Sequence, residues 1–133
     1  MRVAAVALFL LLAACNDSTG ASSPYVGTYA LASIDGTAPP VLLTVSTTPS
    51  IQQKILPSSI TLRADGRYVW TSVDTLFVDT QPPRFQTSAD SGAWDVTGSD
   101  LTLTSDLTSI TGGTISTTEI DMTLGTHAWV FRR

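Results

Sequence analysis

Residues 58–70 read Ser-Ser-Ile-Thr-Leu-Arg-Ala-Asp-Gly-Arg-Tyr-Val-Trp and carry the strongest local signal in the chain. Apolar residues alternate with polar ones on both sides of the turn Ala64–Arg67. The alternation places Ile60 and Leu62 on one face of a first strand, and it places Tyr68 and Trp70 on one face of a second. A glycine in the turn tolerates the positive φ that a tight reversal needs. The stretch therefore predicts a β-hairpin with one apolar face.

The chain after residue 24 repeats this pattern. Period-two alternation recurs between Gly, Pro, Asp and Ser, and apolar residues nowhere keep helical spacing for more than about two turns. The expected strands cover residues 26–34, 41–46, 58–64, 67–78, 91–97, 101–105, 109–116, 119–124 and 127–132. Such short strands with short reversals predict an all-β fold, an up-and-down antiparallel meander that closes into a small barrel of about eight strands. Closure would also remove the unpaired edges of these threonine-rich strands.

Two segments interrupt the alternation. Residues 47–57 have Pro49 near a helix start, Ser50 and Gln53 at capping-box spacing, and Pro57 as a stop. They are expected to form either a plain loop or one to two helical turns over an end of the barrel, with a mobile lid as a third reading. Residues 79–84 contain Pro82-Pro83 and are expected to be a connection, because proline cannot donate to an interior ladder.

The N-terminus has the features of a secretory signal. Met1-Arg2 precedes an apolar run from Val3 to Leu11, and Leu12-Ala13-Ala14-Cys15 follows. The apolar run is too short for a stable transmembrane helix. The last four residues also resemble the lipobox of bacterial lipoproteins, in which the cysteine thiol receives a diacylglyceryl group before cleavage. This resemblance implies lipidation at Cys15, the only cysteine, and anchoring of the chain in a membrane through fatty acyl chains.

Three segments follow from this interpretation: a signal peptide over residues 1–14, a flexible tether over residues 15–24, and one domain over residues 25–133. The tether is expected because its residues are small and polar and cannot anchor a core. Asn16 stands where aspartate is the inner-membrane retention signal of lipoproteins. The resemblance therefore implies the outer membrane of a bacterial cell envelope, facing the periplasm or the surface.

Five short motifs extend the resemblance to the domain. They are Gly27-Thr28-Tyr29, Leu62–Tyr68, Ser91–Trp94, Leu101–Thr104 and Trp129–Arg133. Together they look like small bacterial lipocalin-like lipoproteins, which implies a lipocalin-like barrel. In lipocalins, a Gly-x-Trp on the first strand packs against an arginine from the last strand at the closed end. Tyr29 replaces that tryptophan here, and period two groups Arg133, rather than Arg132, with the inward residues of the last strand.

Composition and residue types exclude several kinds of site. Seven Lys and Arg against eleven Asp and Glu give a formal net charge of -4, so no nucleic-acid surface is expected. One histidine and one cysteine are too few for a zinc or copper site, and no loop has converging oxygens for calcium. No metal and no cofactor is therefore expected.

Catalysis is not expected either. No Gly-x-Ser-x-Gly elbow is present, and His127 sits beside a turn, where a solvated or hydrogen-bonded histidine is expected. The carboxylates near expected reversals are interpreted as turn residues, because aspartate satisfies local backbone donors there. These are Asp65, Asp90, Asp95, Asp100 and Asp106.

The interior of the barrel decides between two functions. The side chains expected to point inward are Ile60, Leu62, Tyr68, Trp70, Trp94, Val96, Leu101, Leu103, Ile120, Met122, Leu124, Trp129 and Phe131. Among them, the candidate ligand-binding residues are Tyr68, Trp70, Trp94 and Trp129. In a small barrel, however, large aromatic side chains also serve simply to fill the core.

A filled core leaves the lower two-thirds of the barrel solid, with any cavity limited to a shallow mouth under residues 47–57. The protein would then be a structural or interaction module of the envelope, partnered by the membrane through Cys15 and by an envelope protein. The alternative is a module that binds a small apolar ligand in the barrel mouth.

Overall fold

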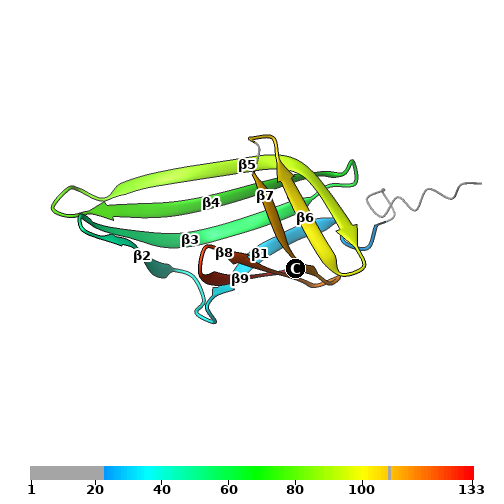
Figure 1. Ribbon diagram of the computed structural model, residues 1–133, viewed down its shortest axis with the longest axis horizontal. Helices are drawn as coiled ribbons and strands as arrows, with labels where there is room; N and C mark the ends of the chain where they lie inside the picture. Colours follow the sequence, from blue (N-terminus) through cyan, green and yellow to red (C-terminus); the bar gives the residue numbers. More distant parts are fainter. Residues whose placement is uncertain (1–22, 108) are drawn as a thin grey trace, which may run out of the picture.

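The computed structural model describes residues 23–107 and 109–133. Within these residues the chain forms antiparallel strands and no helix (Figure 1). The strands are β1 (Gly27–Ile34), β2 (Val41–Thr47), β3 (Ser50–Leu62), β4 (Arg67–Val78), β5 (Arg84–Thr97), β6 (Asp100–Ser105), β7 (Ile110–Ile115), β8 (Glu119–Leu124) and β9 (His127–Arg132). The expected signal peptide, Cys15 and the tether as far as Ser22 lie outside the described residues.

A search of the described residues for a membrane-spanning helix gave none of sufficient length and apolar character.

Eight of the strands close into a barrel. From β3 to β9 each strand is hydrogen-bonded to the next in sequence order. β1 joins the two ends, because its residues Gly27–Ala30 pair with β3 and its residues Ala30–Ile34 pair with β9. The predicted all-β, up-and-down barrel is confirmed, and this architecture is consistent with a lipocalin-like fold.

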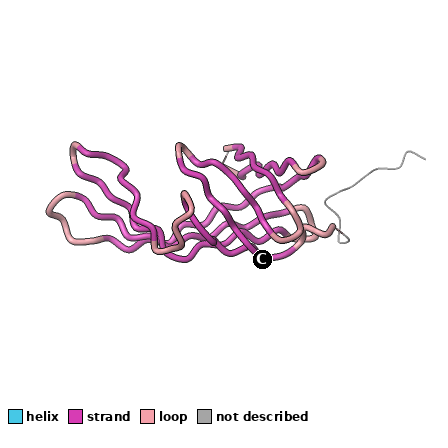
Figure 2. The backbone as a smooth tube through the Cα atoms, turned by 90° about the horizontal axis from the view of Figure 1, so that it is seen from below, coloured by secondary structure: helices cyan, strands magenta, loops and turns pink. Residues whose placement is uncertain are grey.

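The ninth strand, β2, lies outside the barrel. It pairs with Ser50–Ile55 of β3, whereas β1 pairs with Ser59–Leu62 of the same strand. The change of partner coincides with a register shift between Ile55 and Ser58, where Pro57 fits because a bulge does not need its missing N–H. Beyond this shift, β2 and the outer halves of β3, β4 and β5 form a sheet that projects past the barrel (Figures 1 and 2). We call this sheet the extension.

The hairpin over residues 58–70 is confirmed. Gly66 has a φ of 77°, a conformation that residues with a Cβ adopt only under strain. The Asp65 carboxylate accepts a hydrogen bond from the Arg67 amide at 3.1 Å. The turn therefore forms as its sequence predicts.

The expectation of a loop or short helix over residues 47–57 is wrong. Residues 50–57 belong to β3, and Ile51, Gln53 and Ile55 alternate along it opposite Val78, Leu76 and Asp74 of β4. Ile55 is buried in this arrangement. A strand is favoured because the outer half of β4 needs hydrogen-bonded neighbours on both sides, and this segment supplies the one opposite β5.

Two further expectations change with it. β5 begins at Arg84 rather than at residue 91, because residues 84–90 continue the ladder with β4 without a register shift. The expected removal of edges holds only inside the barrel. In the extension, β2 ends the sheet, and the outer half of β5 lies beyond the pairing with β6.

Tyr29 and Arg133 close the end of the barrel at which β1 begins and β9 ends. Tyr29 is fully buried, and its hydroxyl donates to the Tyr25 carbonyl at 2.9 Å. The Arg133 guanidinium carbon lies 5.6 Å from the centroid of the Tyr29 ring, and Arg133 Nη1 donates to the Val26 carbonyl at 2.8 Å. A Cβ on Gly27 would lie 2.8 Å from Arg133 Nη1. Arg133 is thus confirmed as the partner of Tyr29, and the neighbouring glycine makes room for it.

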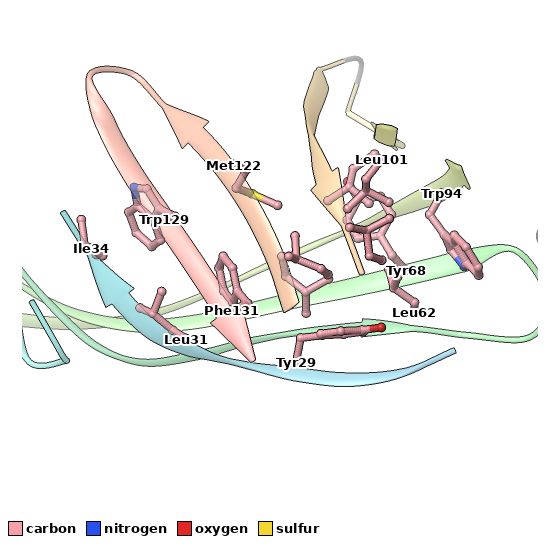
Figure 3. Packing of buried hydrophobic residues seen from close by; sticks show 14 of the residues in the cluster. Tyr29, Leu31, Ile34, Leu62, Tyr68, Trp94, Leu101, Met122, Trp129 and Phe131 are labelled. Atoms are coloured by element: carbon pink, nitrogen blue, oxygen red, sulfur yellow. The ribbon is translucent and has the colours of Figure 1, made fainter. Parts of the chain in front are cut away.

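Apolar side chains fill the barrel (Figure 3). All the residues expected to point inward belong to this core, with Trp70 and Leu124 only partly buried. Leu101, Leu103, Leu62 and Tyr68 are 1% exposed, and all four sit toward the end closed by Tyr29. Close packing of such residues removes apolar surface from water, at about 25 cal/mol per Å². The closed half of the barrel is therefore solid, and open space is confined to the opposite end.

Candidate functional site

The four aromatic residues proposed from the sequence lie in two separate places. Tyr68 and Trp94 are in the closed half, where the Trp94 indole N–H donates to the Arg63 carbonyl at 3.0 Å. Trp70 and Trp129 face the open end, with ring centroids 6.2 Å apart in an edge-to-face arrangement. Phe131 packs beneath both, 5.7 Å from Trp70. The structure therefore brings together only the second pair at the barrel opening.

The two tryptophans differ in how their indole N–H groups are satisfied. Trp70 donates to Ser58 Oγ at 3.0 Å, and Ser58 donates in turn to the Thr71 carbonyl at 2.8 Å. The Trp129 N–H is buried with no hydrogen-bond partner among the described residues. A buried donor without an acceptor costs free energy, so Trp129 is held there by packing rather than by polar contacts.

A hollow of about 260 Å³ forms the mouth of the barrel. It lies between β4, β5 and the start of β7, because β6 ends at Ser105 and no longer separates its neighbours. Its lining is Trp70, Ser72, Ser88, Ala89, Asp90, Ser109 and Thr111. Hydroxyl groups and one carboxylate thus surround a single aromatic ring, and the lining combines polar groups with an apolar face.

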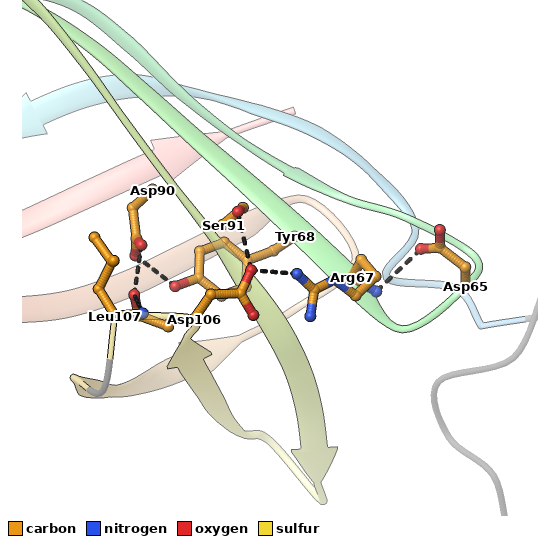
Figure 4. A network of polar contacts seen from close by, with 8 residues as sticks. Asp65, Arg67, Tyr68, Asp90, Ser91, Asp106 and Leu107 are labelled. Carbon is orange, nitrogen blue, oxygen red and sulfur yellow. Dashed lines mark hydrogen bonds and ion pairs between the residues drawn. The ribbon is translucent and has the colours of Figure 1, made fainter.

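Asp90 organises the wall of this mouth (Figure 4). Its two carboxylate oxygens accept hydrogen bonds from the Tyr68 hydroxyl and from Ser105 Oγ, both at 2.5 Å. Burial, followed by the hydrogen bond to Asp90, raises the pKa of the Tyr68 hydroxyl. The tyrosine therefore stays neutral and donates to the carboxylate, which ties β4, β5 and β6 together.

A second buried carboxylate, Asp74, lies farther out on the inner face of the extension. It is 1% exposed, and its Oδ2 accepts hydrogen bonds from Gln53 Nε2 at 2.7 Å and Gln86 Nε2 at 2.6 Å. The three side chains come from adjacent strands: Gln86 lies directly opposite Asp74, and Gln53 lies two residues from Ile55, the register partner of Asp74 on β3. They form a polar row across the extension where the barrel has an apolar core.

The outer face of the extension carries exposed apolar side chains. Leu42, Lys54, Thr75 and Phe85 are register neighbours across the four strands. Phe85 is 78% exposed and Leu42 is 54% exposed. Val45 and Val73 add to the exposed apolar surface of the same sheet. We call these four residues, Leu42, Val45, Val73 and Phe85, the extension patch.

Other polar groups lie in structural positions. His127 Nδ1 is 2.6 Å from Asp35 Oδ2, so the expected hydrogen-bonded turn histidine is found, and this bond is the main reason that the pKa of Asp35 is lowered. Asp65 and Asp106 lie at reversals, but Asp90 and Asp95 lie inside β5, so their reading as turn residues is wrong. In the described parts of the chain, no group of three or more His, Cys, Asp and Glu is placed to hold a metal.

A shallower hollow of about 470 Å³ lies against the outer wall of β7, β8 and β9. It arises because Gly112 and Ala128 place little side chain on that face. Asp121 on its rim has a pKa raised by burial and by the nearby Glu119. Few polar groups converge in this hollow, so the open end of the barrel is the better candidate site.

The exposed position of Phe85 and the position of Asp90 in the mouth escaped the sequence analysis for one reason. Residues 84–90 read Arg-Phe-Gln-Thr-Ser-Ala-Asp, with too few apolar residues for a half-buried strand. The length of the strand over residues 67–78 could have indicated them. A twelve-residue strand needs neighbouring strands of similar length to satisfy its backbone hydrogen bonds.

Comparison with known proteins gives no relative for this chain: no family model matches it, and searches of curated proteins and of solved structures return no match.

Proposed function

We propose that this protein is a small lipocalin-like lipoprotein of the bacterial cell envelope that works by binding another protein rather than by catalysis. Lipid on Cys15 would hold it to the membrane, most simply the outer membrane. The closed barrel would serve as the rigid base, and the extension would serve as the binding surface.

One observation carries the interaction role. The extension patch exposes large apolar side chains on a sheet that projects away from the barrel. A monomeric protein gains nothing from exposing such residues together, whereas a partner surface removes them from water. The solid closed half supports the same role, because it leaves little space there for a ligand.

Anchoring is tested with Cys15→Ser in the full chain. The variant is expected to accumulate as an unprocessed or mislocalised precursor, because serine cannot accept the diacylglyceryl group. Fractionation of cells that carry the parent or the variant measures this. A variant that is processed and remains with the membranes as the parent does would overturn the lipoprotein assignment.

The binding role is tested by cross-linking in cells. A photo-crosslinking phenylalanine analogue in place of Phe85 should give a product of defined mass, because that side chain is the most exposed of the extension patch. The same analogue in place of Thr123, which is exposed on the outer barrel wall, is the matched control. Equal labelling at both positions, or none at either, would contradict the proposal.

A second candidate function is small-molecule binding in the mouth. The hydroxyl-rich lining around the Trp70 ring favours a ligand with hydroxyl groups that stacks on an aromatic face, such as a monosaccharide, over the small apolar ligand of the alternative drawn from the sequence. Tryptophan fluorescence during titration with a monosaccharide and with a fatty acid separates the two. A saturable change with the sugar, lost in Trp70→Ala and kept in Trp94→Phe, would favour this function.

A further inference from the structure

Among the described residues, the outer half of β5 has a hydrogen-bonded neighbour on one side only. Residues 84–90 pair with β4, and the pairing with β6 begins at Gly92. The Asp106 amide donates to the Ser91 carbonyl, and this is the last backbone hydrogen bond on the β6 side among the described residues. Residues 84–89 are exposed, and Asp90 is half-buried. We call residues 84–90 the β5 edge.

The backbone groups of the β5 edge point outward in a fixed order. The Ser91 carbonyl points away from β4, because it accepts from Asp106 on the other side. Backbone groups alternate in direction along a strand, so Phe85, Thr87 and Ala89 also direct their N–H and C=O groups away from β4. The ladder with β4 is regular from Arg84 to Ala93, so this order is not interrupted. The edge therefore offers three donors and three acceptors to an added strand.

The β5 edge is complementary to itself. Two antiparallel copies that overlap over residues 84–90 have Thr87 at their centre. This register places Phe85 opposite Ala89 and Gln86 opposite Ser88. The residues with outward backbone groups then face one another as hydrogen-bonded pairs. A register of maximal overlap is thus also one in which every outward group finds a partner.

The same register pairs two charges that have no ion-pair partner in the part of the chain that the structure describes. Arg84 would lie opposite Asp90 of the second copy, twice in the two-fold arrangement. Within the described residues, Arg84 donates to the neutral Gln81 Oε1 at 3.3 Å, and Asp90 accepts from two neutral hydroxyls. Opposite charges across an antiparallel pair attract.

The other free edge, β2, is less suited to regular pairing. A register shift between Thr44 and Ser46 interrupts it, and such bulges bend a strand and disturb its ladder. Its residues 41–47 also carry no charge that could fix a register.

We propose that two copies of this protein associate through their β5 edges, antiparallel about Thr87, to form one continuous sheet across a two-fold axis. This inference rests on the proposed binding role of the extension and names the partner as a second copy of the chain. Phe85 of each copy then packs beside Ala89 of the other and loses much of its exposure.

Disulfide cross-linking of the full lipidated chain tests the pairing. With Cys15 occupied by lipid, Thr87→Cys introduces the only free thiol, and the centre of a hydrogen-bonded pair has a Cα separation of about 5.5 Å, which suits a disulfide. A dimer band on a non-reducing gel is expected. Thr97→Cys, exposed on the part of β5 covered by β6, is the matched control and should stay monomeric. No more dimer from Thr87→Cys than from Thr97→Cys would overturn the proposal.

The register is tested by mixing two variants. Phe85→Cys and Ala89→Cys should cross-link to each other when both are made in one cell. Each alone should cross-link poorly, because identical positions then lie four residues apart, about 13 Å along the strand. Cross-linking of Phe85→Cys with itself as efficiently as with Ala89→Cys would exclude this register and overturn the proposal.

Disruption of the edge gives an independent test that does not need a cross-link. Thr87→Pro removes an outward N–H and leaves the ladder with β4, so dimerisation should be lost while the melting temperature of the barrel is kept. Arg84→Glu should raise the dissociation constant about tenfold, because two cross-strand attractions become repulsions. Arg63→Glu, at the exposed β3–β4 turn, is the control. Sedimentation of the purified full chain in detergent measures the mass, and a monomeric parent would overturn the inference.

The two proposals fail separately. A product between the Phe85 position and a different protein, with a monomeric parent, would retain the binding role and exclude the second copy. No product of any kind at Phe85 would overturn both.

Discussion

The barrel and the extension use the same three strands, β3, β4 and β5, in opposite ways. In the barrel their inner halves present Ile60, Leu62, Tyr68 and Trp94 to an apolar core. In the extension their outer halves present Gln53, Asp74 and Gln86 on the corresponding face. The length of a strand is therefore independent of whether the barrel closes around it. A strand can run on beyond the core when neighbouring strands complete its ladder.

The first test compares the effect on stability of truncating one phenylalanine in the barrel and one in the extension. Phe131→Ala should cost about 3 to 5 kcal/mol of unfolding free energy, because the ring is fully buried against Trp70 and Trp129. Phe85→Ala should change it by less than about 0.5 kcal/mol, because the side chain is exposed. Chemical denaturation followed by tryptophan fluorescence measures both. Similar costs for the two would mean that the extension is packed as tightly as the barrel.

The second test places a small change at two positions of one strand, β5. A Cβ on Gly92 would lie 1.9 Å from the Thr104 carbonyl oxygen of β6. Gly92→Ala should therefore destabilise the protein by about 3 kcal/mol, since the strands must separate to accept the methyl group. Ser88→Ala, in the extension, removes only a hydroxyl near Ser72 and should cost below about 1 kcal/mol. Thermal unfolding gives the order, and a tolerated Gly92→Ala would contradict the close approach of β5 and β6.

The third test compares the turns at the two ends of the β4 strand. Gly66→Val should cost about 1 to 3 kcal/mol, because valine strains at a φ of 77°. Asp79 begins the β4–β5 connection in the extension with a φ of 43°, and its Oδ1 accepts from the Ser50 amide at 2.9 Å. Asp79→Gly removes the backbone strain of the positive φ but also removes the hydrogen bond to the Ser50 amide. The free energy of unfolding is therefore expected to change by less than about 1 kcal/mol. An unchanged melting temperature for Gly66→Val would remove the turn assignment.

The smallest effect is confined to alkaline pH and to the barrel. The pKa of Tyr68 is raised above its usual value of 10.0 by burial and by Asp90, and burial raises that of Tyr29. Stability is therefore complete below pH 10 and falls as the pH rises above it, because the unfolded chain ionises its tyrosines first. Tyr68→Phe should reduce the loss of unfolding free energy at alkaline pH. Ionisation of Tyr29 should account for part of the loss that this variant still shows. Unfolding curves between pH 8 and pH 11, which extend about one to two pH units around the usual tyrosine pKa, would show it. The same alkaline slope in parent and Tyr68→Phe would contradict the assigned pKa shift.

Within the barrel, most of the local structure could be predicted from the sequence. Period-two alternation located the hairpin at Gly66 and grouped Trp129, Phe131 and Arg133 on one face, because each strand there has one side in the core and one in water. The resemblance to lipocalins implied that Tyr29 pairs with a C-terminal arginine, and the same parity selected Arg133 over Arg132. In the extension the rule failed, since polar side chains occupy both faces of residues 84–90 and prolines interrupt residues 47–57.

The class of the fold, the barrel strands and the reversals between them could be predicted from the amino-acid sequence alone. They depend on alternating side chains and on turn residues, which are neighbours in the chain. Three features became visible only in the three-dimensional structure. β3 changes its partner from β1 to β2 at its bulge, Asp90 faces the mouth from within a strand, and residues 84–90 form a sheet edge. These features depend on hydrogen bonds between strands far apart in sequence. Backbone groups have the same pairing requirement at every residue, so no local pattern of side chains encodes which strand will satisfy them.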